Sequence, residues 1–295
     1  MFERYRDIIA DRNSDMPAHR GIMKYRHAQV QRTARSLPFD LELTRRIRGA
    51  DFAPEWSDSA LIEQLDPWQD LSRVSFAREA APLDIQLGLL NNDRAMLRAF
   101  DDLRTQLLRA MDGSGWSRIA IVSPTSGSGA SFTALNLALS VSRIPSKRAL
   151  LMDLDQRAPD IANMLGIQAN GMMADLLTGA VAPQNYLLKP TYTLALGLGS
   201  GRTENASEIL HARRTGEVLN NMMEMMRPDI SIFDLPAMLE HDDLEAFLPQ
   251  VDGVLLVADA TQTVGAQITE CERRLEGKTN IMGIILNRTR PAKGS

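Results

Sequence analysis

A short glycine-containing loop has the residue types that bind phosphate groups in proteins. It lies in the run SPTSGSGASF at positions 123–132, directly after a strongly apolar segment. Its glycines allow the backbone to turn N–H groups inward, and the helix predicted to begin near Ser131 points its positive end at the same place. Small-residue turns before helices are usually structural, so the loop alone is weak evidence. The predicted phosphate-binding residues are Gly127, Ser128, Gly129, Ala130, Ser131 and Phe132.

This loop lacks the lysine that nucleotide-binding loops use. In the pattern G-x-x-x-x-G-K-[ST], lysine reaches the β- and γ-phosphates and the following hydroxyl holds Mg²⁺. Here Ala130 stands at the lysine position and Ser131 keeps the hydroxyl, with no Lys or Arg between Arg118 and Arg143. Removing one contact to a transferring phosphoryl group commonly lowers the rate by orders of magnitude. We therefore expect weak or absent ATP hydrolysis.

Three aspartates follow apolar runs that are predicted to be strands. Asp153 and Asp155 end the run ALLMDLD, and Asp234 ends ISIFD. The carboxyl ends of parallel strands meet at one edge of a sheet, and Mg²⁺ takes oxygen ligands there directly or through waters. A single strand-end aspartate is more often a helix cap, but three at one edge favour a site. We predict Asp153, Asp155 and Asp234 as catalytic residues, with Ser131, Asp153 and Asp234 as metal ligands.

The elements that must position these residues alternate along the chain. A helix is predicted over residues 93–111, where apolar side chains recur every three or four residues. Six short apolar runs follow, separated by helical or irregular stretches, which is typical of a mostly parallel sheet between two helix layers. The sequence thus predicts a three-layer α/β sandwich of the P-loop NTPase type. The predicted strands are 118–123, 149–153, 192–198, 230–234, 253–258 and 281–286.

Five motifs in order, between about residues 94 and 290, resemble the tyrosine autokinase/ATPase domains of bacterial exopolysaccharide and capsule export. LLMDLDQRAP and ISIFDLP are similar to the family's second Walker-type motif and its Walker B segment, and NASEIL, DGVLLVADATQT and GIILNR follow in the family's order. The resemblance extends to partitioning and septum-placing ATPases. It implies ATP or ADP with Mg²⁺ as cofactors and Asn287 as the adenine contact. It also implies a membrane co-polymerase or chain-length protein as partner, met at the cytoplasmic face.

The departures from this family concern its catalytic and assembly equipment. Besides Ala130, the helix AMLRAFDDLRTQLLRA keeps only Arg104 of the family's oligomerisation triplet, with Arg98 and Asp101 at the other two positions. The family's tyrosine-rich tail has no counterpart, because the last tyrosine is Tyr192. The resemblance therefore implies that any self-association differs from the usual ring, and that tyrosine-tail autophosphorylation does not occur in this sequence.

Composition limits the remaining possibilities. The chain has 295 residues, a single cysteine and a net charge of −4, which disfavours nucleic-acid binding, and no apolar stretch approaches a membrane span. Its charged start lacks a secretory signal, so we expect a cytoplasmic protein, either free or peripheral at the inner face of the membrane. Residues 1–50 carry eleven Lys/Arg against six Asp/Glu. This basic arm either meets anionic lipid or an acidic partner, or is simply solvated.

The sequence predicts two parts and leaves three functions open. A Pro-interrupted extension over residues 1–85 precedes the α/β domain over residues 86–295. Our first hypothesis is a degenerate family member that acts as a regulatory or scaffold partner. The second is a slow ATPase or kinase completed by a partner's Lys or Arg, and the third is a partitioning or septum-type ATPase. The acidic run 240–245 either tunes metal binding or forms an exposed loop and first helical turn.

Overall fold

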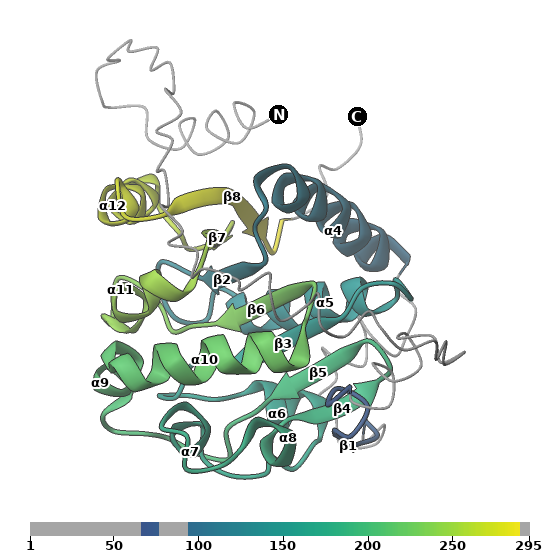
Figure 1. Cartoon of the computed structure of the whole chain (residues 1–295). Helices are drawn as coiled ribbons and strands as arrows, with labels where there is room; N and C mark the ends of the chain where they lie inside the picture. Colours follow the sequence, from purple (N-terminus) through teal and green to yellow (C-terminus); the bar gives the residue numbers. More distant parts are fainter. Residues whose placement is uncertain (1–65, 77–93, 290–295) are drawn as a thin grey trace, which may run out of the picture. The chain divides into compact units, whose positions relative to one another are not determined.

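One eight-stranded sheet forms the centre of the domain (Figure 1). The computed structural model describes residues 66–76 and 94–289. Strand order is β1-β4-β5-β3-β6-β2-β7-β8, and every neighbouring pair is parallel except β4 and β5. This confirms the predicted P-loop NTPase-like α/β fold. The strands are β1 (Ser72–Arg73), β2 (Arg118–Val122), β3 (Ala149–Asp153), β4 (Leu188–Thr191), β5 (Leu194–Gly197), β6 (Ile230–Asp234), β7 (Gly253–Asp259) and β8 (Asn280–Asn287).

Helices cover both faces of this sheet. One face carries α4 (Arg94–Ser114), α5 (Ala130–Ser142) and α6 (Ile161–Leu165), which pack in one apolar cluster with alternate strand residues. The opposite face carries α7 (Met173–Leu177), α9 (Ala206–His211), α10 (Arg213–Met226), α11 (Asp243–Phe247) and α12 (Gly265–Leu275). The remaining short helices are α8 (Pro183–Tyr186) and the 3-10 turn η2 (Leu248–Gln250). The predicted helix over residues 93–111 corresponds to α4.

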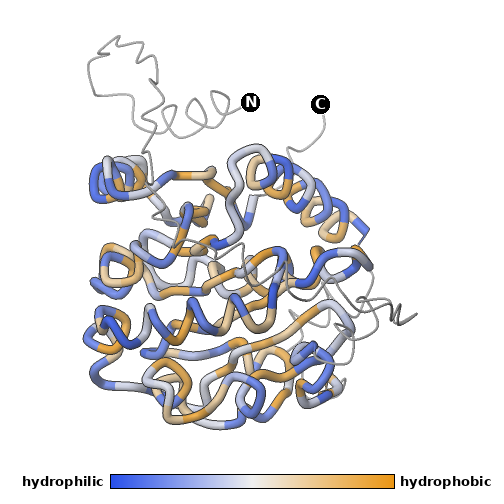
Figure 2. Tube along the Cα trace, in the orientation of Figure 1, coloured by the Kyte–Doolittle hydropathy of each residue, from blue (hydrophilic) through white to orange (hydrophobic). Residues whose placement is uncertain are grey.

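Alternation along the central strands explains why both faces are covered. In β2, Ile119 and Ile121 belong to the cluster under α4 and α5, whereas Ala120 and Val122 belong to the cluster on the other face. Such strands read as nearly continuous apolar runs, because both sides of the pleat are buried. Figure 2 accordingly shows the inner strands mainly in the hydrophobic colour, while α10 and α12 alternate between the two colours.

The sequence missed two strands at one edge of the sheet. β4 contains Lys189 and Pro190, which are poor strand signals, and β1 has only two residues. β1 lies within residues 66–76, which we assigned to the extension, but which pair with β4 and add the edge strand. Trp68 anchors this segment, because its side chain is fully buried and its Nε1 donates to the Tyr192 carbonyl oxygen at 2.9 Å. Residues 1–65, which carry the predicted basic arm, lie outside the described residues.

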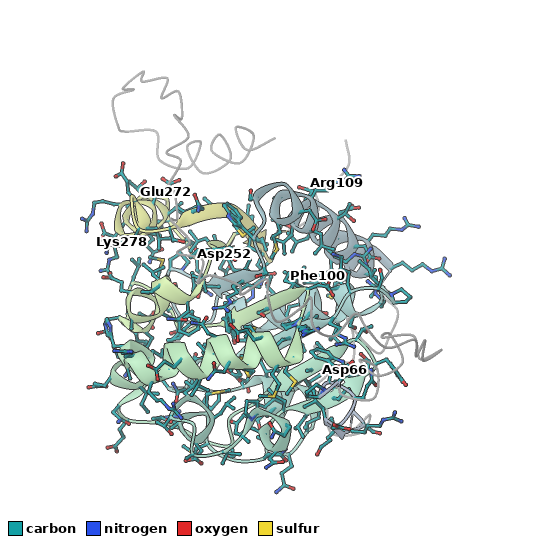
Figure 3. The ribbon with its side chains drawn as sticks, in the orientation of Figure 1. Asp66, Phe100, Arg109, Asp252, Glu272 and Lys278 are labelled. Carbon is teal, nitrogen blue, oxygen red and sulfur yellow. The ribbon has the colours of Figure 1, made fainter. Side chains whose placement is uncertain are left out.

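The polar side chains of α4 that face α5 form hydrogen bonds and ion pairs within the chain. The Asp101 carboxylate accepts a hydrogen bond from the Ser140 hydroxyl at 2.7 Å and pairs with Arg143. Arg104 donates to the Ser140 carbonyl oxygen at 2.8 Å. Phe100, labelled in Figure 3, meets the ring of Phe132 edge-on at 6.2 Å between centroids. Two of the three positions that resemble an oligomerisation triplet therefore stabilise the α4–α5 packing.

Candidate functional site

The phosphate-binding loop and two of the aspartates meet at the carboxyl edge of the sheet. β6 lies between β2 and β3, with Asp234 in register with Ile121 on one side and with Asp153 on the other. The loop leaves β2 just beyond Ile121 and enters α5 at Ala130. Because parallel strands end together, three sequence-distant segments converge where ligands bind in folds of this type.

Backbone geometry makes the loop suitable for an anion. Gly127 and Gly129 have φ values of 79° and 89°, a left-handed conformation that favours glycine. A Cβ on Gly129 would lie 2.2 Å from Asn287 Nδ2, so a side chain there would displace Asn287. No side chain caps the first turn of α5, so its N–H groups can donate hydrogen bonds to a ligand. Ala130 itself is nearly buried, at 8% exposure.

Asp153 and Asp234 form a buried carboxylate pair beside this loop. Each is 1% exposed. Asp153 Oδ2 accepts the N–H groups of Asp160 and Ile161, both at 3.1 Å, while Asp153 Oδ1 and both Asp234 oxygens have no hydrogen bond of normal geometry. Burial raises the pKa of Asp153 to about 7, and the charge of Asp155 adds to this shift. Burial also raises the pKa of Asp234 well above its usual value, and there the charge of Asp153 adds to the shift. Ser131 acts in the opposite direction, lowering the pKa of Asp234.

Asp155 makes different contacts from Asp153 and Asp234. Its Oδ1 accepts the N–H groups of Arg157 and Ala158 at 3.2 and 3.0 Å, so the carboxylate closes the turn after β3. Burial raises its pKa, and the negative charge of Asp243 adds to the shift, which places these two carboxylates near each other. Asp155 thus shapes the edge of the site through its own loop.

The orphaned oxygens of the pair fit a divalent cation. Mg²⁺ is commonly held by one or two carboxylates together with waters and phosphate oxygens. Asp153 and Asp234 provide the carboxylates, and Ser131 provides a hydroxyl close enough to influence Asp234. In the part of the chain that the structure describes, no cluster of three or more His, Cys, Asp and Glu side chains could hold a metal alone. Phosphate oxygens would therefore be needed to complete this cation site.

Asn287 and Phe132, two further predicted site residues, both make contacts within the chain. Asn287, at the end of β8, donates through Nδ2 to the Ser128 carbonyl oxygen at 3.0 Å, so it braces the loop in this structure. Phe132 turns its ring toward Phe100, which puts that side chain in the α4–α5 interface. No local sequence pattern indicates the contact of Asn287 with Ser128, because these residues are 159 positions apart.

Sequence reasoning also missed two acidic contacts after β6. Glu240 binds Ser126 of the loop, through the backbone N–H at 2.9 Å and through the hydroxyl. Asp243 is fully buried rather than exposed, and its Oδ2 accepts a hydrogen bond from Arg157 Nε at 2.9 Å. The burial of Asp243 depends on its pairing with Arg157, which is 86 residues earlier in the chain, so no local pattern indicates it.

An open groove lies beside the turn that follows β3. It encloses about 740 Å³ and is lined by residues that follow β3, α6 and β5, among them Asp160 and Arg202. The N–H of Asp160 also holds Asp153 Oδ2, so the groove wall is joined directly to the pair. Asp153 itself does not line the groove, so this wall reaches the pair only through the backbone of Asp160.

Comparison with known proteins agrees with this geometry. No family model matches the chain. A curated protein of Ralstonia solanacearum, "Putative tyrosine-protein kinase EpsB", is 27% identical over 204 residues, which are 68% of this chain and 26% of that protein. The chain thus spans about a quarter of that relative's length. The solved kinase domain of VpsO is 26% identical with a TM-score of 0.59, over 68% of this chain and 98% of that domain.

In sequence and fold, the chain is similar to bacterial tyrosine kinase domains. More distant structures establish the fold of this chain. The kinase domain of Escherichia coli tyrosine kinase ETK is 20% identical with a TM-score of 0.62, over 82% of this chain and 99% of that one. The septum site-determining protein MinD of Pyrococcus horikoshii, solved with Mg-ADP, is 19% identical with a TM-score of 0.51, over 60% and 72%. The same α/β fold therefore serves tyrosine kinases and MinD.

Proposed function

We propose that this chain binds Mg-nucleotide and acts as a regulatory or scaffold partner in exopolysaccharide or capsule export, with impaired phosphoryl transfer. The observation that carries the proposal is the buried pair of Asp153 and Asp234 beside a phosphate-binding loop that has Ala130 in place of lysine. The pair supports nucleotide binding, whereas the alanine opposes catalysis.

The pair favours retention of a cation. Burying a carboxylate without a partner is unfavourable, and burying two side by side is worse because the charges repel each other. Asp153 and Asp234 leave three oxygens without a normal hydrogen bond, which a purely structural role does not require. Asp153 and Asp234 would hold Mg²⁺ carried in by a nucleotide, and the cation would supply the positive charge that both carboxylates lack. Both aspartates then serve as binding residues.

The loop is poorly equipped to stabilise phosphoryl transfer. The negative charge of the transferring phosphoryl group is normally stabilised by lysine, Mg²⁺ and arginine together. Ala130 removes the lysine, and Arg157 at the end of the turn after β3 is already engaged by buried Asp243. Backbone N–H groups and Mg²⁺ can still hold a diphosphate, so binding is expected to outlast catalysis.

Partner and location follow from the family relationship. We propose a cytoplasmic chain that docks on a membrane co-polymerase or chain-length protein, without nucleic-acid binding. None of the helices in the described residues is long and apolar enough to cross a membrane. Asp101 and Arg104 are bound within the chain, so self-association through the family's ring contacts is not expected.

A slow ATPase or kinase completed by a partner is the second candidate. The groove lined by Asp160 favours this candidate, because a phosphoryl acceptor could enter there. A partner would then supply the positive charge of the lysine that Ala130 replaces. A septum-type positioning ATPase is a third candidate, supported by fold likeness alone.

Restoring the lysine tests the impairment. Phosphate release and phosphotyrosine formation would be measured for the native chain, for Ala130→Lys and for Ala130→Met, which matches lysine in length without its charge. We expect no turnover in the native and Met proteins and measurable turnover in Ala130→Lys. Turnover by the native chain alone would reject the proposed impairment. Turnover that appears only with a purified partner would favour the second candidate.

A further inference from the structure

The segment that follows β6 runs along the first half of the phosphate-binding loop. The N–H of Leu239 donates to the Pro124 carbonyl oxygen at 3.2 Å. At the end of this run, Glu240 reaches the tip of the loop, where Oε1 accepts the Ser126 N–H at 2.9 Å and Oε2 accepts the Ser126 hydroxyl at 2.5 Å. A carboxylate therefore occupies donors on the loop that is expected to meet phosphate.

The charge of this carboxylate is not offset within the loop. The two hydrogen bonds from Ser126 lower the pKa of Glu240, so the side chain is ionised at neutral pH. The side chain of His241, the next residue in the chain, also lowers the pKa of Glu240. Residues 119–142 contain no Lys or Arg. The loop that offers hydrogen-bond donors to a phosphate therefore carries a carboxylate at its tip and no basic side chain of its own.

We propose that Glu240 determines nucleotide specificity at this site and makes it favour nucleoside diphosphates over triphosphates. The inference rests on the proposed nucleotide binding. With the same Mg²⁺, a triphosphate carries one more negative charge than a diphosphate, and the lysine that would reach the β- and γ-phosphates is absent. Repulsion of one extra charge by a nearby partly solvated carboxylate corresponds to about a fivefold difference in affinity.

Calorimetric titrations of Mg-ADP and Mg-ATP at pH 8 would test this proposal. The proteins compared are the native chain, Glu240→Gln and Glu245→Gln. Glutamine at position 240 can still accept the Ser126 N–H through its carbonyl oxygen, so the loop contact is kept while the charge is removed. Glu245 is the matched control, since it lies on α11 and pairs with Lys278 at 3.3 Å instead of the loop.

We expect the native chain and Glu245→Gln to bind Mg-ADP more tightly than Mg-ATP. Glu240→Gln should raise affinity for Mg-ATP about fivefold more than affinity for Mg-ADP. An affinity ratio that is the same in Glu240→Gln and in the native chain would overturn the proposal, as would a native preference for Mg-ATP.

The same titrations in an Ala130→Lys background separate this inference from the proposed function. If the native chain binds neither nucleotide at millimolar concentration, its proposed nucleotide binding fails. The Ala130→Lys protein then still reports on Glu240, because the ratio of Mg-ATP to Mg-ADP affinity should rise when Glu240→Gln is added. An unchanged ratio there, or no binding in either background, rejects the role of Glu240.

Discussion

Asp153 and Asp234 lie in register on neighbouring strands, and three of their four carboxylate oxygens have no hydrogen bond of normal geometry. The two side chains are buried at the edge where the phosphate-binding loop begins. Such a pair is stable when one member is protonated or when a cation is bound. Stability should therefore depend on pH and on Mg²⁺ together.

Stability of the metal-free chain should fall as pH rises. The pKa of Asp153 is about 7 in the folded chain against 3.8 for an exposed aspartate, so the folded state binds the proton more tightly than the unfolded state. The stability that Asp153 contributes is fully present below about pH 3.8 and is lost as the pH rises to about 7. Urea unfolding in EDTA should show a loss of about 3 kcal/mol between pH 4.5 and pH 8. A constant free energy of unfolding over that range would contradict the assigned burial.

Asp234→Asn should stabilise the metal-free chain at pH 8. The substitution keeps the shape of the side chain and removes one of two adjacent buried charges, which should raise the free energy of unfolding by about 1–2 kcal/mol. It should also abolish any stabilisation of the native chain by Mg²⁺, measured as a shift in thermal midpoint. Asp112→Asn, at an exposed position on α4, is the control and should leave both quantities unchanged. Destabilisation by Asp234→Asn would show that the carboxylate is satisfied internally.

Breaking the Arg157–Asp243 pair should destabilise the fold. Asp243 is fully buried, and Arg157→Met would leave its charge without the partner that donates at 2.9 Å. We expect the free energy of unfolding in urea at pH 7 to fall by about 2–3 kcal/mol. This is less than for a fully buried pair, because Arg157 is partly exposed to solvent. Arg213→Met is the matched control, since that arginine is almost fully exposed and pairs only along its own helix. Equal stability of the two variants would reject a structural role for the pair.

Trp68 should be essential for attaching residues 66–76 to the sheet. Its indole is fully buried, and Lys189 Nζ donates to the Trp68 carbonyl oxygen at 2.7 Å. Trp68→Ala should cost about 3–5 kcal/mol and should increase hydrogen exchange in β4. Tyr192→Ala keeps the carbonyl that accepts the indole N–H, and its exposed side chain adds little, so it should be near neutral. A neutral Trp68→Ala would mean that the edge strand is dispensable.

The sheet was predictable because its inner strands are apolar on both faces. β3 and β6 end at Asp153 and Asp234 as predicted, and β2 ends at Val122, one residue before its predicted end. These strand ends define the edge at which the candidate site forms. β4 was not predicted, because Pro190 argues against a strand and β4 pairs at the sheet's periphery. Local patterns thus identify strands by burial, and they fail where a strand is short and half-exposed.

Contacts that hold the loop were beyond the reach of local patterns. Glu240 meets Ser126 across 114 positions, and Asn287 meets Ser128 across 159. Neither contact has a periodic or spacing signal, because each depends on which strands become neighbours in the sheet. The buried Asp243 was missed for the same reason, since its run of acidic neighbours is typical of an exposed loop.

Calorimetric titration of Mg-ADP into the native chain and into Asp234→Asn tests the central claim most directly. The account predicts saturable binding by the native chain, which disappears when EDTA removes Mg²⁺ and weakens at least tenfold in Asp234→Asn, roughly the effect expected from losing a metal ligand. Absence of native binding at millimolar Mg-ADP, or equal affinity of the two proteins, would contradict it.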